Sequence, residues 1–433
     1  MSATLPKPFA PESRLFLEHI LGQIPERQDP YTTLRQQARA QLAELGIPTP
    51  REEDWKYSDL SPLLAHEFRL AVAADPALDA ATLEPWLWPE TGYSRAVFVN
   101  GYFAPQLSDL SGLPTALQVI PLAQAPGELL QTLAKTDVFT ALNTAHLGDG
   151  IQIALQPGQE VSLPLHLLFL TVAPEGEAVL AQPRCLLSLQ AHGSLTLIED
   201  HVSLGSGIPF SNAVTEIALA EGSRLHHVIL QRQGSPAFHI NQTAVRQSCD
   251  SHYRLQAIQW GSQFSRHNLE ITQAGAQAHT QLQGLTLLKG SQHSDTHSRL
   301  VHQAPHGSSR QLHKCIVDET AHAVFSGRIL VSREAQLTDA AQTNRNLLLG
   351  PKARVNTQPQ LEIFADNVKC AHGATVSQLE MEEIFYLQSR GIPQAQARQL
   401  LTCAFATEVL EGIPLAQLPA LVARQLGSHG FNQ

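Results

Sequence analysis

Three segments of this chain resemble one another and recur at intervals of 27 and 29 residues. They are SPAFHINQTAVRQ from Ser235, SQFSRHNLEITQ from Ser262 and SQHSDTHSRLVHQ from Ser291. They alternate with strand-like runs, which are RLHHVIL from Arg224, YRLQAI from Tyr253 and TQLQGL from Thr280. A period of 20 to 50 residues built from short strands and turns is typical of a β-solenoid, in which each turn packs on its neighbours. The repeat predicts a β-helix, with a β-sandwich of evenly spaced hairpins as the alternative.

The repeats belong to a longer strand-like stretch, from residue 95 to residue 377. It opens with AVFVNGYFA, in which Asn100 and Gly101 form the dipeptide favoured in tight hairpin turns. A helical interruption is expected from Pro126 to Leu142. Glycine and proline contribute 27 residues each and aromatic residues only 6%, which fits a turn-rich β architecture. We therefore assign residues 95–377 to the β-helix core of a mainly β protein.

Helical patterns flank this core on both sides. Within residues 1–94, PYTTLRQQARAQLAELGIP has apolar residues at helical spacing before a glycine and a proline end the pattern. Trp55, Trp86 and Trp88 fall in the same region, and we expect it to pack as a small unit of its own. Residues 378–433 return to helical spacing and predict a C-terminal helical domain.

Charge and apolar content argue against two classes of partner. Acidic residues outnumber basic ones, 39 to 29, so the net charge is −10 at pH 7 and a groove that neutralises many phosphates is not expected. The longest apolar run, Leu163 to Val172, is far shorter than the ~20 residues of a membrane span. The first residues show no secretory signal, which predicts a cytoplasmic protein. Neither nucleic acid nor a membrane is expected as a partner.

The motifs of several common enzyme classes are missing. The sequence has no GxxxxGK[ST] phosphate loop and no GxGxxG, GxSxG or HExxH. The sequence therefore gives no motif that supports nucleotide hydrolysis or ordinary hydrolase or dehydrogenase chemistry. Five scattered cysteines without a CxxC pair indicate reduced thiols rather than a disulfide framework. Of these, we expect Cys185 and Cys403 to be core residues.

Histidine is concentrated in the repeat region, with 14 of the 20 between His192 and His322. HSDTH and HQAPH each have two histidines at i,i+4 spacing, which on a helix could place two imidazoles on one metal. Both pairs lie in strand-like sequence, where residues four apart stand about 13 Å apart. The favoured interpretation is that these histidines are polar residues on solvated faces of the turns.

One short motif, DNVKCAHGATV from Asp366 to Val376, combines a thiol with an imidazole. In a strand, residues i and i+2 point to the same face, so Cys370 and His372 are expected to project together about 7 Å apart. Both are competent ligands for iron or zinc. Two ligands do not complete a metal site. The other ligands would come from another strand or another chain, as in a half-site at a subunit interface. The alternative is a buried structural cysteine beside a surface histidine.

Several motifs together carry a resemblance to a known family. They are EDWKYSDL from Glu53, SSRQLHKCIVD from Ser308, QTNRNLLLG from Gln342, QPQLEIFADNVKCAHGATV from Gln358 and IFYLQSRGI from Ile384. In these motifs the chain resembles the SufB/SufD family of iron–sulfur cluster assembly proteins, and within it the SufD branch most. The resemblance covers essentially the whole chain. It implies a right-handed parallel β-helix between N-terminal and C-terminal helical domains.

The resemblance also implies partners and a site. In this family SufD pairs with SufB through the β-helix cores, and each binds a copy of the ABC-type ATPase SufC through its C-terminal helices. Cys370 and His372 would then lie at the SufB interface, where a transient iron–sulfur cluster is built. No cofactor is expected in the isolated chain, for which a homodimer is an alternative. No ligand role is carried over to Cys315.

The C-terminal helices are the expected docking surface for the ATPase. The candidate contact residues are Arg390, Gly391, Leu400, Leu401 and Ala404, and the alternative is a cap that only buries the last turn of the solenoid. The resulting hypothesis is a non-catalytic scaffold subunit. The alternative function is a cytoplasmic β-helix carbohydrate-active enzyme, which the sparse aromatic residues and the lack of an Asp/Glu cluster in the repeats disfavour.

Overall fold

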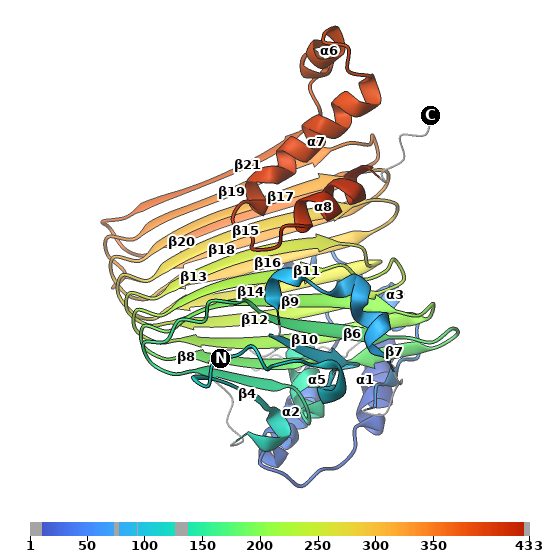
Figure 1. Cartoon of the computed structure of the whole chain (residues 1–433), viewed down its shortest axis with the longest axis vertical. Helices are drawn as coiled ribbons and strands as arrows, with labels where there is room; N and C mark the ends of the chain where they lie inside the picture. Colours follow the sequence, from blue (N-terminus) through green and yellow to red (C-terminus); the bar gives the residue numbers. More distant parts are fainter. Residues whose placement is uncertain (1–10, 73–77, 93, 126–136, 428–433) are drawn as a thin grey trace, which may run out of the picture.

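The computed structural model describes residues 11–72, 78–92, 94–125 and 137–427. Its core is a two-walled parallel β-helix in which each complete turn gives one strand to each wall (Figure 1). Strands β8 to β21 form about seven such turns. The predicted mainly β fold, with a β-helix core and helices at both termini, is confirmed.

One wall, called sheet A, has eleven strands in the order β20-β18-β16-β14-β12-β10-β8-β5-β4, with β7 beside β10 and β1 beside β7. Among the described residues β4 pairs antiparallel with β5, and the other pairs are parallel. The strands are β1 (Arg69–Leu70), β4 (Leu117–Pro121), β5 (Ile151–Leu155), β7 (Ala178–Ala181), β8 (Arg184–Leu189), β10 (Ile208–Leu219), β12 (Phe238–Gln247), β14 (Phe264–Gln273), β16 (His293–His302), β18 (His322–Val331) and β20 (Arg354–Ile363).

The other wall, sheet B, has ten strands in the order β21-β19-β17-β15-β13-β11-β9-β6-β2-β3. In the part of the chain that is described, β2 and β3 are antiparallel and the other pairs are parallel. The strands are β2 (Arg95–Val99), β3 (Tyr102–Phe103), β6 (Leu165–Val172), β9 (Ser194–Leu204), β11 (Arg224–Gln231), β13 (His252–Trp260), β15 (His279–Leu288), β17 (Ser308–Val317), β19 (Asp339–Leu348) and β21 (Lys369–Ser377).

The three sequence repeats are successive strands of sheet A. Phe238, Phe264 and His293 are register partners in β12, β14 and β16. The alternating runs are β11, β13 and β15 of sheet B, also parallel and in register. A β-sandwich of hairpins would pair these strands antiparallel, so that alternative is wrong.

Residues with a left-handed backbone conformation at equivalent corners keep the repeat length of the solenoid nearly constant from turn to turn. Asp250, Gln277, His306 and Leu337 stand at the same corner of four successive turns, each with φ between 54° and 61°. At each of them the backbone N–H donates to a carbonyl of the next turn, for example Gln277 N to Pro305 O at 3.1 Å. A single left-handed residue per corner redirects the chain without breaking the stack.

Two local predictions ahead of the repeats can be compared with the structure. The Asn100-Gly101 hairpin is confirmed, because both residues have positive φ and Val99 pairs with Tyr102 across the turn. The helical interruption falls partly on residues 126–136, which lie outside the described residues. Its remainder is α5 (Val138–His146), whose first turn is capped where Asp137 accepts a hydrogen bond from Thr140 N.

The N-terminal helices pack on the outer faces of both sheets. They are α1 (Pro11–Gln23), α2 (Thr32–Glu44), α3 (Ser61–Leu64) and α4 (Ala80–Leu83), with short 3₁₀ turns at Glu53–Trp55, Glu84–Trp86, Pro89–Thr91, Pro105–Leu107 and Leu122–Gln124. Helices α1 to α3 share one apolar cluster with Phe210, Phe238 and Phe264 of sheet A. The expectation of a separately packed N-terminal unit is therefore wrong.

Two of the tryptophans pack on different sheets. Trp55 lies over the Arg266 guanidinium of sheet A, 3.7 Å from ring centroid to Cζ. Trp88 is in the cluster on the outer face of sheet B and donates from Nε1 to Asp200 Oδ2 at 3.0 Å. The N-terminal segment therefore contacts both walls, since apolar side chains on each outer face need cover.

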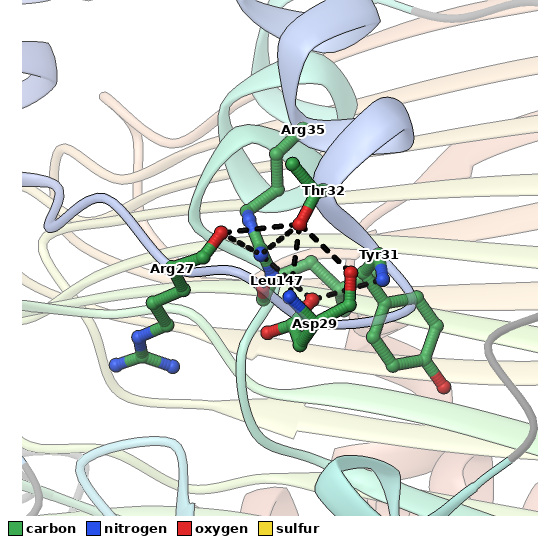
Figure 2. Close-up of polar contacts among 6 residues, drawn as sticks. All are labelled: Arg27, Asp29, Tyr31, Thr32, Arg35 and Leu147. Carbon is green, nitrogen blue, oxygen red and sulfur yellow. Dashed lines mark hydrogen bonds and ion pairs between the residues drawn. The ribbon is translucent and has the colours of Figure 1, made fainter.

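Arg35 fixes the connection between α1 and α2, as Figure 2 shows. Its guanidinium donates to the carbonyl oxygens of Leu147 at 2.6 Å and Arg27 at 2.9 Å, and to Asp29 Oδ1 at 2.7 Å. Thr32 Oγ1 donates to the Asp29 carbonyl at 2.7 Å. The ion pair lowers the pKa of Asp29 against the opposing effect of burial. The connection is thus tied to the loop that follows α5.

The C-terminal helices are α6 (Met381–Ser389), α7 (Gln394–Leu410) and α8 (Leu418–Gly427). Helices α7 and α8 lie against the outer face of sheet B, where Val409 and Val422 share an apolar cluster with Ile258 and Leu285. In Figure 1, α6 projects beyond the last strands. The predicted helical C-terminus is confirmed. Because α7 and α8 cover the side of the solenoid and β21 stays exposed, the predicted alternative of a cap over its last turn is wrong. No helix in the described ranges is long and apolar enough to span a bilayer.

Candidate functional site

The last turn of the solenoid is open. Strands β20 and β21 end the two sheets, and each is paired along one edge only within the described residues. In β19, one turn earlier, alternate residues are buried, whereas the residues of β21 are exposed apart from the half-buried Cys370. Ile363, Phe364 and Val376 are apolar side chains at this end with 40 to 63% exposure. This end therefore offers free strand edges and apolar surface together.

Cys370 lies on the inward side of this open end. It is the register partner of Ala340 in β19 and packs against the small cluster that contains Ile329, Val331 and Ala365. Burial raises the pKa of the Cys370 thiol above its ordinary value. The structure thus gives a half-buried, protonated thiol at the rim rather than a fully enclosed structural cysteine.

His372 stands two residues further along the same strand, as the partner of Gln342. Because alternate residues of a strand share a face, Cys370 and His372 leave β21 on the same side, as predicted from the sequence. His372 is exposed. Among the described residues no group of three or more His, Cys, Asp or Glu is arranged to hold a metal ion. A metal bound here would need further ligands from outside this chain.

The QTNRN segment supports the terminal strand from below. Gln342, Asn344 and Asn346 alternate along β19, point inward and are at most 1% exposed. Asn344 Nδ2 donates to His313 O at 3.0 Å, and Asn346 Nδ2 donates to Thr375 O at 3.0 Å. These amides tie β19 to the strands on either side. This role was not predicted from the sequence, although polar residues at every second position of a buried strand are a visible signal.

Of the five predicted partner-binding residues, two lie in the turn after α6 and three lie on α7. Arg390 is exposed, with its guanidinium 5.4 Å from the Tyr386 ring, and Gly391 ends α6 at a φ of +85°. Leu400 and Ala404 are exposed on α7 and Leu401 is half-buried.

A second set on α6 was not singled out from the sequence. Met381, Phe385 and Tyr386 are 58 to 71% exposed, while Ile384 between them is fully buried. The buried position identifies the face of α6 that packs, and the other three project away from it. The sequence MEEIFYLQS does indicate this exposed set, because it has more apolar residues than fit on one buried face of a helix.

The histidines of the repeat region are divided between the interior and the surface, so the interpretation as solvated surface residues holds for the exposed His306 but is wrong for the buried His302. His201, His227, His239, His267, His302 and His313 are buried. The i,i+4 pairs do not converge on a metal: in HSDTH, His297 Nε2 lies 3.0 Å from Asp295 Oδ1, and in HQAPH, His302 is buried while His306 forms a corner. Burial lowers the pKa of His267 to about 3 and of His313 to about 4, so these imidazoles are neutral.

Glu199 is the charged centre of this interior. It accepts a hydrogen bond from Thr215 Oγ1 at 3.0 Å and lies 3.2 Å from His227 Nε2 and 3.7 Å from His201 Nε2. Although burial alone would raise it, the two imidazoles hold the pKa of Glu199 well below its usual range. A buried carboxylate without a neighbouring lysine or arginine needs such partners to remain ionised.

Taken together, the fold and this end define a class of protein: a β-solenoid with helices on its sides and one turn left free for association. Comparisons with known proteins identify the family. The chain matches the SufBD core domain of the SUF system for iron–sulfur cluster assembly over residues 170–405, and the SufBD protein N-terminal region over residues 23–167. The chain therefore belongs to the SufBD family of the SUF system for iron–sulfur cluster assembly.

Individual relatives agree with this assignment. An iron–sulfur cluster assembly SufBD family protein of Synechocystis sp. is 44% identical over 89% of this chain and 88% of its own length. The iron–sulfur cluster assembly protein SufD of Escherichia coli is 34% identical over 90% of this chain and 91% of its own. The chloroplastic protein ABCI7 of Arabidopsis thaliana is 31% identical over 95% and 89%. The predicted SufB/SufD resemblance is confirmed.

Proposed function

We propose that this chain is a non-catalytic scaffold subunit of a SUF iron–sulfur cluster assembly complex, acting in the cytoplasm. In this proposal its open end pairs with SufB, and its C-terminal helices bind the ATPase SufC. The observation that carries the proposal is that Cys370 and His372 lie on the last, open strand of the solenoid.

The free edges of β20 and β21 support pairing with a second β-helix. An exposed edge presents unpaired N–H and C=O groups, and a partner strand satisfies them while covering apolar side chains such as Phe364 and Val376. A solenoid partner would continue both sheets at once. In the isolated chain a second copy could occupy the same edges, so a homodimer is the expected competitor.

The chemistry of Cys370 and His372 fits a nascent cluster as cargo. A thiolate is a strong ligand for iron and an imidazole takes a harder coordination position. SufB would supply the remaining ligands across the interface. The thiol proton must leave when iron binds, since the thiolate is the ligand. The cluster is transient in this proposal, and the isolated chain holds none.

The test is anaerobic cluster assembly in the complex of this chain with SufB and SufC. Cys370→Ala and His372→Ala should each reduce iron and sulfide per complex severalfold, while His372→Cys retains part of the cluster because it keeps a ligand atom. Cys370→Ala should cost well under ~1 kcal/mol in stability, because Cys370 is only half-buried in a small cluster.

Matched controls are Cys249→Ala and His306→Ala, which change an exposed cysteine and an exposed histidine at corners of earlier turns. Wild-type cluster content in both the Cys370 and His372 variants would contradict the proposal. The carbohydrate-active alternative makes a different prediction: polysaccharide cleavage by the purified chain with no ATPase bound. The family assignment favours the scaffold.

A further inference from the structure

Beneath His372, the inward side chains of sheet B form a hydrogen-bonded column. Gln311, Gln342 and His372 are register partners in β17, β19 and β21. Gln311 Nε2 donates to Ser298 Oγ across the interior at 2.8 Å, and Gln342 Nε2 donates to Gln311 Oε1 at 2.8 Å. The hydrogen bonds therefore run from Ser298 in sheet A across the interior to Gln311, and from there to Gln342 in the next turn toward the open end.

The orientation of the Gln342 amide follows from this chain. Its nitrogen is used by Gln311, so its oxygen is the atom left to accept a bond from elsewhere. Gln342 Oε1 is buried and has no hydrogen-bond partner among the described residues. A buried acceptor without a partner is uncommon in folded proteins and calls for a donor nearby.

Sheet A leaves room for this amide. Gly327 faces Gln342 from β18, and a Cβ at Gly327 would lie 2.1 Å from Gln342 Nε2. The φ of Gly327 is not in the left-handed region, so the glycine is needed for space rather than for backbone conformation. The absence of a side chain at position 327 lets the amide lie across the interior.

We propose that Gln342 is a positioning residue for His372: its Oε1 accepts the N–H of one ring nitrogen and leaves the lone pair of the other nitrogen directed to the open end. The importance of the unprotonated nitrogen rests on the proposed function, in which His372 binds iron. The reach is sufficient, because Gln311 and Gln342 already bridge the same spacing between adjacent turns. His372 is exposed and can turn its ring toward the amide.

The physical reason is tautomer control. A neutral imidazole has one protonated and one unprotonated nitrogen, and the partner of the N–H decides which nitrogen remains able to bind a metal. Gln342 would select one tautomer before any partner or iron arrives. Because Gln342 does not itself touch the cluster, its effect should operate only through His372.

The test is the ¹⁵N spectrum of ring-labelled histidine in the full-length, metal-free chain, with His372→Gln used to assign the signal. In the wild type His372 should show one dominant tautomer. Gln342→Leu and Gln342→Asn should both move its ring shifts to those of a freely exchanging imidazole. The control is Gln259→Leu, which removes another buried interior glutamine.

Unchanged His372 shifts in the folded Gln342 variants, or an equal change in Gln259→Leu, would overturn the proposal. Gln342→Asn serves if Gln342→Leu does not fold. A second readout is cluster content in the complex with SufB and SufC: Gln342→Leu should lower it severalfold, and Gln342→Leu with His372→Ala should be no worse than His372→Ala alone. If the spectrum changes as expected but His372→Ala assembles clusters normally, the contact stands and the proposed function fails.

Discussion

At the scale of single residues, the direction of each side chain relative to the solenoid wall sets the reactivity of the cysteines. Cys185 and Cys315 point inward and are buried, Cys249 is exposed at a corner, and Cys370 and Cys403 are half-buried. Burial raises the pKa of Cys315 to about 12 and that of Cys185 well above its usual value. Neither inward thiol is therefore a thiolate near neutral pH.

Alkylation with iodoacetamide at pH 8 should follow this order. Cys249 should be modified first, and Cys185 and Cys315 should stay unmodified in the native protein because access and ionisation both oppose reaction. In a denaturant all five should react. Peptide mass spectrometry over a time course measures each site. Modification of Cys315 at the rate of Cys249 under native conditions would contradict the assignment of Cys315 to the interior.

At the scale of elements, the C-terminal helices divide into an anchor and a projecting part. Helix α7 is held on sheet B where Lys314 Nζ lies 2.7 Å from Glu408 Oε2 and Gln256 Nε2 donates to Val409 O at 2.8 Å. Helix α6 instead exposes Met381, Phe385 and Tyr386. Truncating the chain after residue 375 would uncover the outer face of sheet B, so point substitutions on α6 test docking more cleanly.

The double substitution Phe385→Glu and Tyr386→Glu should weaken SufC binding at least tenfold, because two large apolar contacts and their desolvation are lost. The melting temperature should stay within about 2 °C, since neither side chain is buried. Isothermal titration calorimetry measures the affinity. The control is Leu15→Glu on α1, another exposed apolar residue on a helix. Wild-type affinity in the double variant would show that the ATPase binds elsewhere.

At the scale of the whole molecule, buried neutral histidines make stability depend on pH. Burial lowers the pKa of several of them below the ordinary value of 6.5, and six examples are His146, His239, His267, His293, His302 and His313. The unfolded chain takes up protons at these sites below pH 6.5 while the folded chain does not. The stabilisation is therefore complete above pH 6.5 and is lost as the pH falls toward 4.

The size of this effect predicts acid unfolding. Six such histidines disfavour the folded state by about 8 kcal/mol at pH 5.5, which is comparable with the total stability of a typical domain. The urea midpoint should fall steeply between pH 6.5 and 5. His313→Gln should reduce the proton uptake on unfolding by about one. A urea midpoint that is flat from pH 7 to 5 would contradict the burial of these residues.

Local chemistry was sufficient for much of the architecture. The period of the repeats, the Asn100-Gly101 turn and the helical spacing after residue 378 depend on neighbours within a few residues, and each prediction is confirmed. The side on which Cys370 and His372 leave their strand also followed from the two-residue period. These features need no knowledge of distant contacts, because backbone geometry imposes them.

Tertiary structure decided what lies inside. Alternation along a strand defines two faces, but both faces of these sheets are covered in places: the interior by facing strands, the outer faces by helices. Polar residues such as His313 and Gln342 therefore look solvent-facing in the sequence and are buried in the fold. The separation of Trp55 from Trp88 and the open end at β21 arise in the same way, since both depend on which surfaces of the solenoid the terminal segments cover.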